Sequence, residues 1–328
     1  MARALIGIPT WNRPGFVKEA IASACAQTFT DIRVLVSDNC SPGTVGQEIN
    51  QFIQSLNDPR VEFVRQPENC GENGQSHFFL RECKEEYIVF LHDDDRLEPD
   101  LIARAVDRLD NDPSVDFFSC NQYLFDEQGN ILEGETEKYN KWLMRDKLPD
   151  GPIDNILELV LERLMFGLCG SVFRTRTLRQ CGLDDSVDAF PFDFNVILRQ
   201  AENRKRVWWD SRKLVGYRWH AGQARKVSCW EYDERHITGF MRLLEARTFS
   251  GRAERLRRWL LAFSYRRYAY IRFVSGEAGE GYRYLGNALR QDPLRWRLWA
   301  YVGMAVVLPF LIRPIWGNRV TLAKPAEQ

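Results

Sequence analysis

Short apolar runs alternate with helical patterns along the first 120 residues, and this alternation constrains the fold more than any other feature of the chain. The expected strands cover residues 4–9, 32–38, 61–66, 87–92 and 115–119. The expected helices between them cover residues 15–26, 45–56, 74–83 and 99–109. A repeated order of strand, helix and strand predicts an α/β fold with a mostly parallel central sheet covered on both faces.

The residues that follow each expected strand are the first candidates for a binding site. In open α/β sheets, ligands bind beyond the carboxyl ends of the strands. The segments at that edge are residues 10–13, 38–41, 69–74 and 92–96. No single segment is strong evidence for a binding site, because Asp, Asn and Ser are also common in turns. Their shared location at one edge of the sheet is stronger evidence.

The sharpest motif is LHDDDRLEPD, in which Asp93, Asp94 and Asp95 follow a nearly all-apolar strand. Three adjacent carboxylates repel one another unless a positive charge lies among them. Alternation along a strand would direct Asp93 and Asp95 to one side, where they would bind a hard divalent cation, Mn²⁺ or Mg²⁺. The alternative is a solvated acidic loop that caps the helix expected to start at Pro99.

Four segments in order resemble a known family. They are IPTWNR, ASACAQTFTDIRVLVSDNCSPG, ENCGENG and YIVFLHDDDRLEPDLI, and their order and spacing are similar to the family 2 glycosyltransferases of the GT-A fold. The resemblance implies a Rossmann-like GT-A domain. It also implies an enzyme that binds a nucleotide-diphosphate sugar through a divalent metal and transfers the sugar with inversion.

The resemblance assigns roles to residues one by one. The residues implied in nucleotide-sugar binding are Pro9, Thr10, Asn12, Asp38, Asn69, Gly71, Asp93, Asp94 and Arg218. The implied metal ligands are Asp95, Asp93 and His220. The family's Glu-Asp pair, whose Asp is the general base, is reduced here to Asp193 because Phe192 precedes it, and Asp188 is the reserve candidate. A helix-capping role for Asp193 is the alternative.

Two regions are expected along the chain. Residues 1–228 would form the GT-A domain, with a nucleotide-binding half at about 1–120 and an acceptor half at about 121–228, and residues 229–328 a helical C-terminal region. Within the acceptor half, residues 123–135 predict a hairpin, and the polar stretch that follows, with Lys138, Lys141 and Arg145, predicts a flexible lid. The eight scattered cysteines are expected to be reduced core residues.

The C-terminal region differs from the rest in charge. Residues 251–328 carry 14 basic and 5 acidic side chains, and the apolar stretch 298–312 is too short to span a bilayer. Its flanking Arg and Trp residues favour peripheral membrane contact, although a helix packed on the core is the alternative. The N-terminal apolar stretch is too short for a secretory signal, so we expect a cytoplasmic protein that acts at the inner membrane face.

The predicted function is metal-dependent, inverting transfer of a sugar to a hydroxyl of a glycan or lipid-linked acceptor in cell-envelope polysaccharide synthesis. The donor is a nucleotide-diphosphate sugar, with uridine diphosphate first among the bases. One alternative is a non-catalytic nucleotide-sugar binding protein, and another is a phosphatase of the haloacid dehalogenase type. Nucleic acid is excluded as a partner because the 45 basic and 45 acidic side chains leave no net attraction for it.

Overall fold

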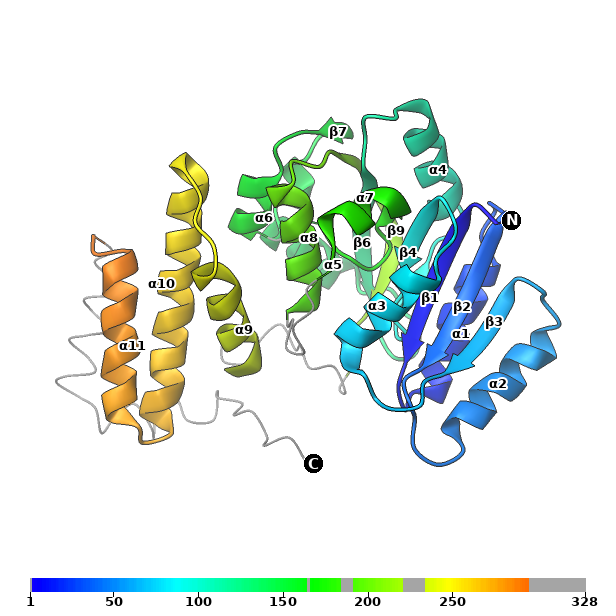
Figure 1. Cartoon of the computed structure of the whole chain (residues 1–328), viewed down its shortest axis with the longest axis horizontal. Helices are drawn as coiled ribbons and strands as arrows, with labels where there is room; N and C mark the ends of the chain where they lie inside the picture. Colours follow the sequence, from blue (N-terminus) through cyan, green and yellow to red (C-terminus); the bar gives the residue numbers. More distant parts are fainter. Residues whose placement is uncertain (1, 164–165, 184–190, 221–233, 295–328) are drawn as a thin grey trace. The chain divides into compact units, whose positions relative to one another are not determined.

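The computed structural model describes residues 2–163, 166–183, 191–220 and 234–294 (Figure 1). The chain divides into two compact units, residues 1–220 and 221–328. The predicted boundary at residue 228 lies outside the described residues, as do Asp188 and the stretch 298–312.

The first unit is built on one mixed sheet. Its strands follow the order β3-β2-β1-β4-β8-β6-β9-β5, with β7 paired to β9. The strands are β1 (Ala4–Thr10), β2 (Ile32–Asp38), β3 (Val61–Arg65), β4 (Tyr87–Phe90), β5 (Arg96–Leu97), β6 (Phe117–Phe125), β7 (Gly151–Ile153), β8 (Val172–Arg174) and β9 (Val207–Arg218). The first four are parallel to one another, and β8 pairs antiparallel with both β4 and β6. The predicted α/β class and mostly parallel sheet are confirmed.

Helices cover both faces of this sheet, as the strands that are apolar on both faces require. The helices are α1 (Pro14–Cys25), α2 (Val45–Leu56), α3 (Gly71–Glu82), α4 (Leu101–Asn111), α5 (Glu133–Trp142), α6 (Leu157–Arg163), α7 (Thr175–Cys181) and α8 (Phe192–Glu202), with a 3-10 turn at Arg145–Lys147. The apolar sides of α1, α2 and α4 share one core with the alternate residues Ile6, Ile8, Val34 and Val36.

Helix α3 covers the opposite face, where Gly7 has no side chain. A Cβ at Gly7 would lie 2.7 Å from the ring of Phe79, closer than real side chains approach. The absence of a side chain on β1 therefore lets α3 lie directly on the strand, which places the loop before α3 beside the carboxyl ends of β1 and β2.

One prediction for the acceptor half is confirmed in a shorter form, and another was wrong. The expected hairpin turns back on the end of β6 through an antiparallel bridge of Phe125 with Ile131, and the N–H of Leu132 donates to the carbonyl of Leu124 at 2.8 Å. The expected polar lid forms α5 and the 3-10 turn, in which Arg145 is buried and donates to Gln122 Oε1 at 2.9 Å. The side chains that hold this half-buried helix in place are polar, so its sequence resembles that of a loop.

The second unit contains helices α9 (Glu234–Glu245), α10 (Gly251–Val274) and α11 (Ala278–Gln291) in its described part. Ala269 and Leu285 join α10 to α11, and Phe273 fits against Gly281, where a Cβ would lie 2.7 Å from its ring. This agrees with the predicted helical C-terminal region. No helix among the described residues is both long and apolar enough to cross a membrane.

Candidate active site

The acidic motif forms a tight turn at the carboxyl end of β4. The strand ends at Phe90, and the backbone N–H of Asp95 donates to the carbonyl of His92 at 3.2 Å. Asp93, Asp94 and Asp95 are 7%, 8% and 0% exposed. Burial of three adjacent carboxylates contradicts the solvated-loop alternative, because a loop that only caps a helix would leave them in water.

Asp93 and Asp94 share the cation Arg13, whose Nη1 lies 3.1 Å from Asp93 Oδ1 and 2.9 Å from Asp94 Oδ2. Thr10 also donates its hydroxyl to Asp93 Oδ2 at 2.9 Å. Burial and the neighbouring charge of Asp94 nevertheless raise the pKa of Asp93 to about 6. For Asp94, burial is outweighed by the contact of His220 Nε2 at 3.1 Å and the charges of His92 and Arg13, which lower its pKa.

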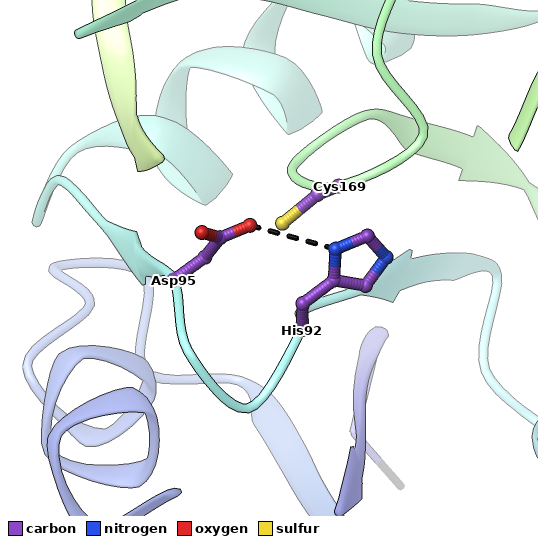
Figure 2. Close-up of side chains that lie close together, drawn as sticks. All are labelled: His92, Asp95 and Cys169. Atoms are coloured by element: carbon purple, nitrogen blue, oxygen red, sulfur yellow. Dashed lines mark ion pairs between the residues drawn. The ribbon is translucent and has the colours of Figure 1, made fainter. Parts of the chain in front are cut away.

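Asp95 faces a different set of groups. Its Oδ1 accepts the backbone N–H of Arg218 at 3.0 Å, whereas Oδ2 accepts no hydrogen bond and lies 3.5 Å from His92 Nδ1. Cys169 Sγ points toward the same carboxylate from the loop before β8 (Figure 2). Burial and the charge of Asp94 raise the pKa of Asp95, although the contact with His92 opposes this.

The expected pairing of Asp93 with Asp95 was wrong. Alternation applies to a strand, but β4 ends before His92, and the turn instead gives Asp93 and Asp94 a common partner in Arg13. Among the described residues, the ligand atoms of Asp93, Asp95 and His220 do not gather within 4.8 Å of one another. Those of His92, Asp95 and Cys169 do.

The ends of β1 and β2 meet beside this turn. Thr10 pairs with Asp38 in the parallel register, as Pro9 does with Ser37. Asp38 is fully buried, accepts the backbone N–H of Ser41 at 3.1 Å and lies 3.1 Å from Arg65 Nη1. A second contact to this segment comes from Asn12, whose backbone N–H donates to Ser41 Oγ at 2.8 Å.

The loop before α3 is tied to the end of β2. Asn39 Nδ2 donates to Asn69 Oδ1 at 2.9 Å, and Asn39 Oδ1 accepts the backbone N–H of Cys70 at 2.9 Å. Gly71, with φ of +68°, donates its N–H to Asn69 Oδ1 at 3.0 Å. The structure thus brings Pro9, Thr10, Asn12, Asp38, Asn69 and Gly71 to one edge of the sheet, next to the acidic turn.

Asp193 lies in the first turn of α8, where the sequence predicted a helix start. Its Oδ1 is buried without a hydrogen bond and lies 3.9 Å from His92 Nε2. Burial lowers the pKa of His92, but the ion pair with Asp95 and the charge of Asp193 outweigh it and raise that pKa to about 10. His92 therefore links the acidic turn to the candidate base.

Arg218 lies beneath the turn and has no exposed surface. Its guanidinium packs between the rings of Phe16 and Phe125, donates to the carbonyl of Asp94 at 2.8 Å and meets Glu19 at 2.5 Å. In this position it supports the acidic turn from within the protein, and its contact with a diphosphate stays a prediction.

Sequence reasoning assigned no role to three residues that the structure places around the acidic turn: Arg13, His92 and Cys169. Arg13 and His92 stand within the motifs IPTWNR and LHDDD, so the demand of three carboxylates for positive neighbours was the signal that could have found them. Cys169 had no such signal, since it lies far along the chain. The expectation of core cysteines holds for Cys169 and the other buried ones, Cys83, Cys120 and Cys181, but Cys70 is exposed.

The mixed sheet with helices on both faces defines a class of fold, the GT-A fold of glycosyltransferases. The chain matches a mannosyltransferase of Pyrobaculum calidifontis, solved with GDP-Man and Mn²⁺, at a TM-score of 0.58 and 16% identity over 97% of this chain and 84% of that one. TarS 1–349 of S. aureus with UDP-GlcNAc matches at a TM-score of 0.59 and 15% identity, over 97% and 89% of the two chains. These likenesses show the fold.

The chain belongs to glycosyl transferase family 2, whose sequence model matches residues 5–155. A putative colanic acid biosynthesis glycosyl transferase, WcaA of Escherichia coli, is 30% identical over 203 residues, covering 62% of this chain and 67% of that protein. A GalNAc(5)-diNAcBac-PP-undecaprenol beta-1,3-glucosyltransferase of Campylobacter jejuni is 28% identical over 131 residues, covering 40% and 41% of the two. The protein is therefore a glycosyltransferase, and the phosphatase alternative was wrong.

Proposed function

We propose that this glycosyltransferase moves a sugar from a nucleotide-diphosphate donor to a hydroxyl of a glycan or lipid-linked acceptor, with inversion and with a divalent cation. The observation that carries the proposal is the buried acidic turn beside the Thr10–Asp38 strand ends. We place the nucleoside at that edge, formed with Asn12, Asn69 and Gly71, so that its diphosphate extends toward Asp93 and Asp94. Uridine diphosphate is our first choice of donor nucleotide.

The residues of the turn fit a hard divalent cation such as Mn²⁺ or Mg²⁺. Three carboxylates lie in one turn, and the fully buried Asp95 Oδ2 accepts no hydrogen bond. Asp93, Asp95 and His220 stay the proposed ligands, and because their ligand atoms do not gather within 4.8 Å of one another in the described part of the chain, a cation would have to draw them together. When bound, a cation there would stabilise the negative charge that develops on the diphosphate leaving group.

The rest of the chemistry belongs to side chains of this chain. Asp193 would accept the proton of the acceptor hydroxyl as that oxygen attacks the sugar from the face opposite the leaving group, which gives inversion. His92, 3.9 Å away, would hold the Asp193 carboxylate in place. Arg13 is partly exposed and already lies between Asp93 and Asp94, so it is placed to meet the diphosphate as well.

Similar proteins support the setting of the reaction. The colanic acid and undecaprenol-linked names of the relatives favour a cell-envelope polysaccharide pathway at the inner membrane face. The basic, Trp-rich residues 295–328 would supply peripheral membrane contact. Their deletion should reduce sedimentation with anionic vesicles while transfer to soluble acceptors continues, and unchanged sedimentation would remove the membrane part of the proposal.

The direct test is a thermal-shift screen of nucleotide sugars with and without Mn²⁺. A ligand at about 100 times its dissociation constant adds roughly 2.7 kcal/mol to the stability of the native state, so one donor class should raise the melting temperature only when Mn²⁺ is present. That donor is then incubated with glycan and lipid-linked acceptors, and the anomer of the product is read by NMR. No shift with any donor would contradict the proposal, and binding without turnover across the acceptors would favour the non-catalytic alternative.

A further inference from the structure

Three potential metal ligands converge at the back of the acidic turn. His92 and Asp95 come from the turn after β4, and Cys169 comes from the loop before β8 (Figure 2). The ligand atoms His92 Nδ1 or Nε2, a carboxylate oxygen of Asp95 and Cys169 Sγ all lie within 4.8 Å of one another. In Figure 2 the sulfur lies beside the line that joins the carboxylate to the imidazole.

The backbone fixes this arrangement before any ion binds. Cys169 forms an isolated parallel bridge with Phe90, and the N–H of Gly170 donates to the carbonyl of Phe90 at 3.1 Å. The turn hydrogen bond from Asp95 to His92 fixes the other two residues. A site held by backbone hydrogen bonds on two sides needs little reorganisation to take up a ligand.

A second observation points to a ligand. Asp95 Oδ2 is fully buried, accepts no hydrogen bond and faces His92 and Cys169. A buried carboxylate oxygen without a hydrogen bond is costly, and a coordinated cation would satisfy it.

The donor set distinguishes one kind of ion from another. Nitrogen, sulfur and oxygen donors together suit a borderline-soft ion such as Zn²⁺, which binds Cys, His and Asp in tetrahedral sites and often leaves one position open. Mn²⁺ and Mg²⁺ prefer oxygen ligands and gain little from a thiolate. The front of the turn, with Asp93 and Asp94, offers those oxygens instead.

We propose that His92, Asp95 and Cys169 form a zinc-binding site that shares Asp95 with the catalytic cation, so that zinc inhibits the transferase. Binding replaces the thiol proton of Cys169 and the imidazolium proton of His92 by bonds to zinc and releases both protons to solvent; no oxidant or reductant takes part. The inhibition rests on the proposed function, whereas zinc binding does not. Asp95 Oδ1 already accepts the backbone N–H of Arg218, so Oδ2 is the oxygen left for an ion, and zinc bound there takes a ligand from the catalytic cation.

Cobalt reports the site without any turnover. Co²⁺ added to the metal-free full-length protein should give a cobalt–thiolate charge-transfer band in the near ultraviolet, which Zn²⁺ then abolishes. Cys169→Ser should remove the band and weaken zinc binding, measured against a chromophoric chelator, by at least about 100-fold, because loss of a direct ligand costs no less than loss of a supporting group. A thermal melt confirms that the variant is folded, and Cys169→Ala is the second variant.

The chain offers a matched control in Cys181, which is 5% exposed against 6% for Cys169 and belongs to neither cluster of possible metal ligands found among the described residues. Cys181→Ser should keep the band. A band that survives Cys169→Ser, as binding at the exposed Cys70 would produce, overturns the proposal, and so does the absence of any band in the wild-type protein.

Inhibition is tested under saturating Mn²⁺ and donor. Zinc should suppress transfer by the wild-type protein and by Cys181→Ser, while Cys169→Ser keeps its Mn²⁺-supported rate at the same zinc concentration. Equal inhibition of all three overturns the link between the sites. If Mn²⁺ supports no transfer but the cobalt band is present, the proposed function fails and the zinc site stands; the reverse result removes the zinc site alone.

Discussion

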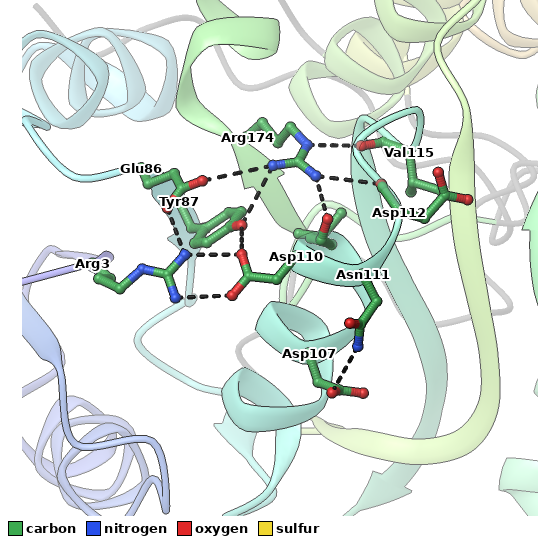
Figure 3. Close-up of polar contacts among 10 residues, drawn as sticks. Arg3, Glu86, Tyr87, Asp107, Asp110, Asn111, Asp112, Val115 and Arg174 are labelled. Carbon is green, nitrogen blue, oxygen red and sulfur yellow. Dashed lines mark hydrogen bonds and ion pairs between the residues drawn. The ribbon is translucent and has the colours of Figure 1, made fainter.

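The two ends of strand β4 carry polar networks of opposite character. At the amino end, Arg3 and Arg174 face Glu86 and Asp110, with Tyr87 between them (Figure 3). At the carboxyl end, three buried aspartates share the cation Arg13 and the imidazoles of His92 and His220. Both networks join distant segments of the chain, but only the one at the amino end gives every buried polar side-chain atom a hydrogen-bond partner.

The amino-end network is complete. Arg3 contacts Asp110 at 2.9 Å and Glu86 at 2.6 Å, and Tyr87 donates its hydroxyl to Asp110 at 2.5 Å. Arg174 donates to the carbonyl of Val115 at 2.8 Å and also to that of Leu109. None of these side chains has a buried polar atom without a partner.

The carboxyl end leaves Asp95 Oδ2 and Asp193 Oδ1 buried without hydrogen bonds. The same strand has a network at its amino end in which every buried polar side-chain atom has a hydrogen-bond partner. The unpaired oxygens at the carboxyl end are therefore not a general property of the strand. The difference indicates that the amino end serves stability and that the carboxyl end keeps unsatisfied acceptors for a ligand, at some cost in stability.

The largest effect should follow removal of Asp95. Asp95→Ala should lower transfer on the order of 10⁴-fold, because the charge on the leaving diphosphate loses its main stabilising partner. It should also abolish Mn²⁺-dependent binding of the nucleotide in calorimetry. Asp110→Asn makes a similar change at the amino end and should leave the rate per folded molecule unchanged. Near-wild-type transfer by Asp95→Ala would contradict the assignment of the carboxyl end of β4 to ligand binding.

The next effect separates the base from the cation site. Asp193→Asn should lower kcat on the order of 10³-fold, because an amide cannot accept the proton of the acceptor hydroxyl. Nucleotide binding with Mn²⁺ should stay at the wild-type level, since Asp193 would contact the acceptor side. A loss of nucleotide affinity in this variant would place Asp193 among the binding groups instead.

The parallel half of the fold could be predicted from sequence, because its strands are apolar on both faces and alternate with helices along the chain. β2 and α2 fall at the predicted residues, and β1 and α1 within one residue at each end. β5, β7 and α7 were not predicted, because two strands of three residues or fewer and one short helix carry too little periodicity to show. β9 was predicted only from residue 213, since its first half includes the polar Asp210, Ser211 and Arg212.

The candidate site was predicted in its location but not in its internal geometry. Strand ends identify Thr10, Asp38 and the aspartates, since parallel strands end at one edge. The sharing of Arg13 by Asp93 and Asp94 depends on the turn from His92 to Asp95, which forms because β4 ends at Phe90, two residues before the predicted strand end. Cys169 depends on the antiparallel pairing of β8 with β4, which local sequence does not encode.

A third variant tests the amino end directly. Arg174→Met should lower the free energy of unfolding by about 3 kcal/mol, because it leaves buried carbonyls and the Tyr87 hydroxyl without their donor. Urea unfolding measures the change, and the transfer rate per folded molecule should not move. Arg13→Met is the comparison at the carboxyl end: its guanidinium is partly exposed and water can partly replace it beside Asp93 and Asp94, so its loss should cost less than the loss of Arg174. Equal losses of unfolding free energy in the two variants would contradict the view that the amino end of β4 serves stability and the carboxyl end serves binding.

The smallest effect is a pH dependence at Asp93. Its pKa is about 6 in the folded protein and about 4 in an unfolded chain, so the folded form holds the proton more tightly. Metal-free protein should therefore lose roughly 2 kcal/mol of stability as the pH rises from about 4 to about 6, and Asp93→Asn should remove that loss. Urea unfolding with a chelator at several pH values measures the difference between the two proteins. Parallel profiles would mean that Arg13 and Thr10 already compensate the Asp93 charge, and the carboxyl end would then be as well satisfied as the amino end.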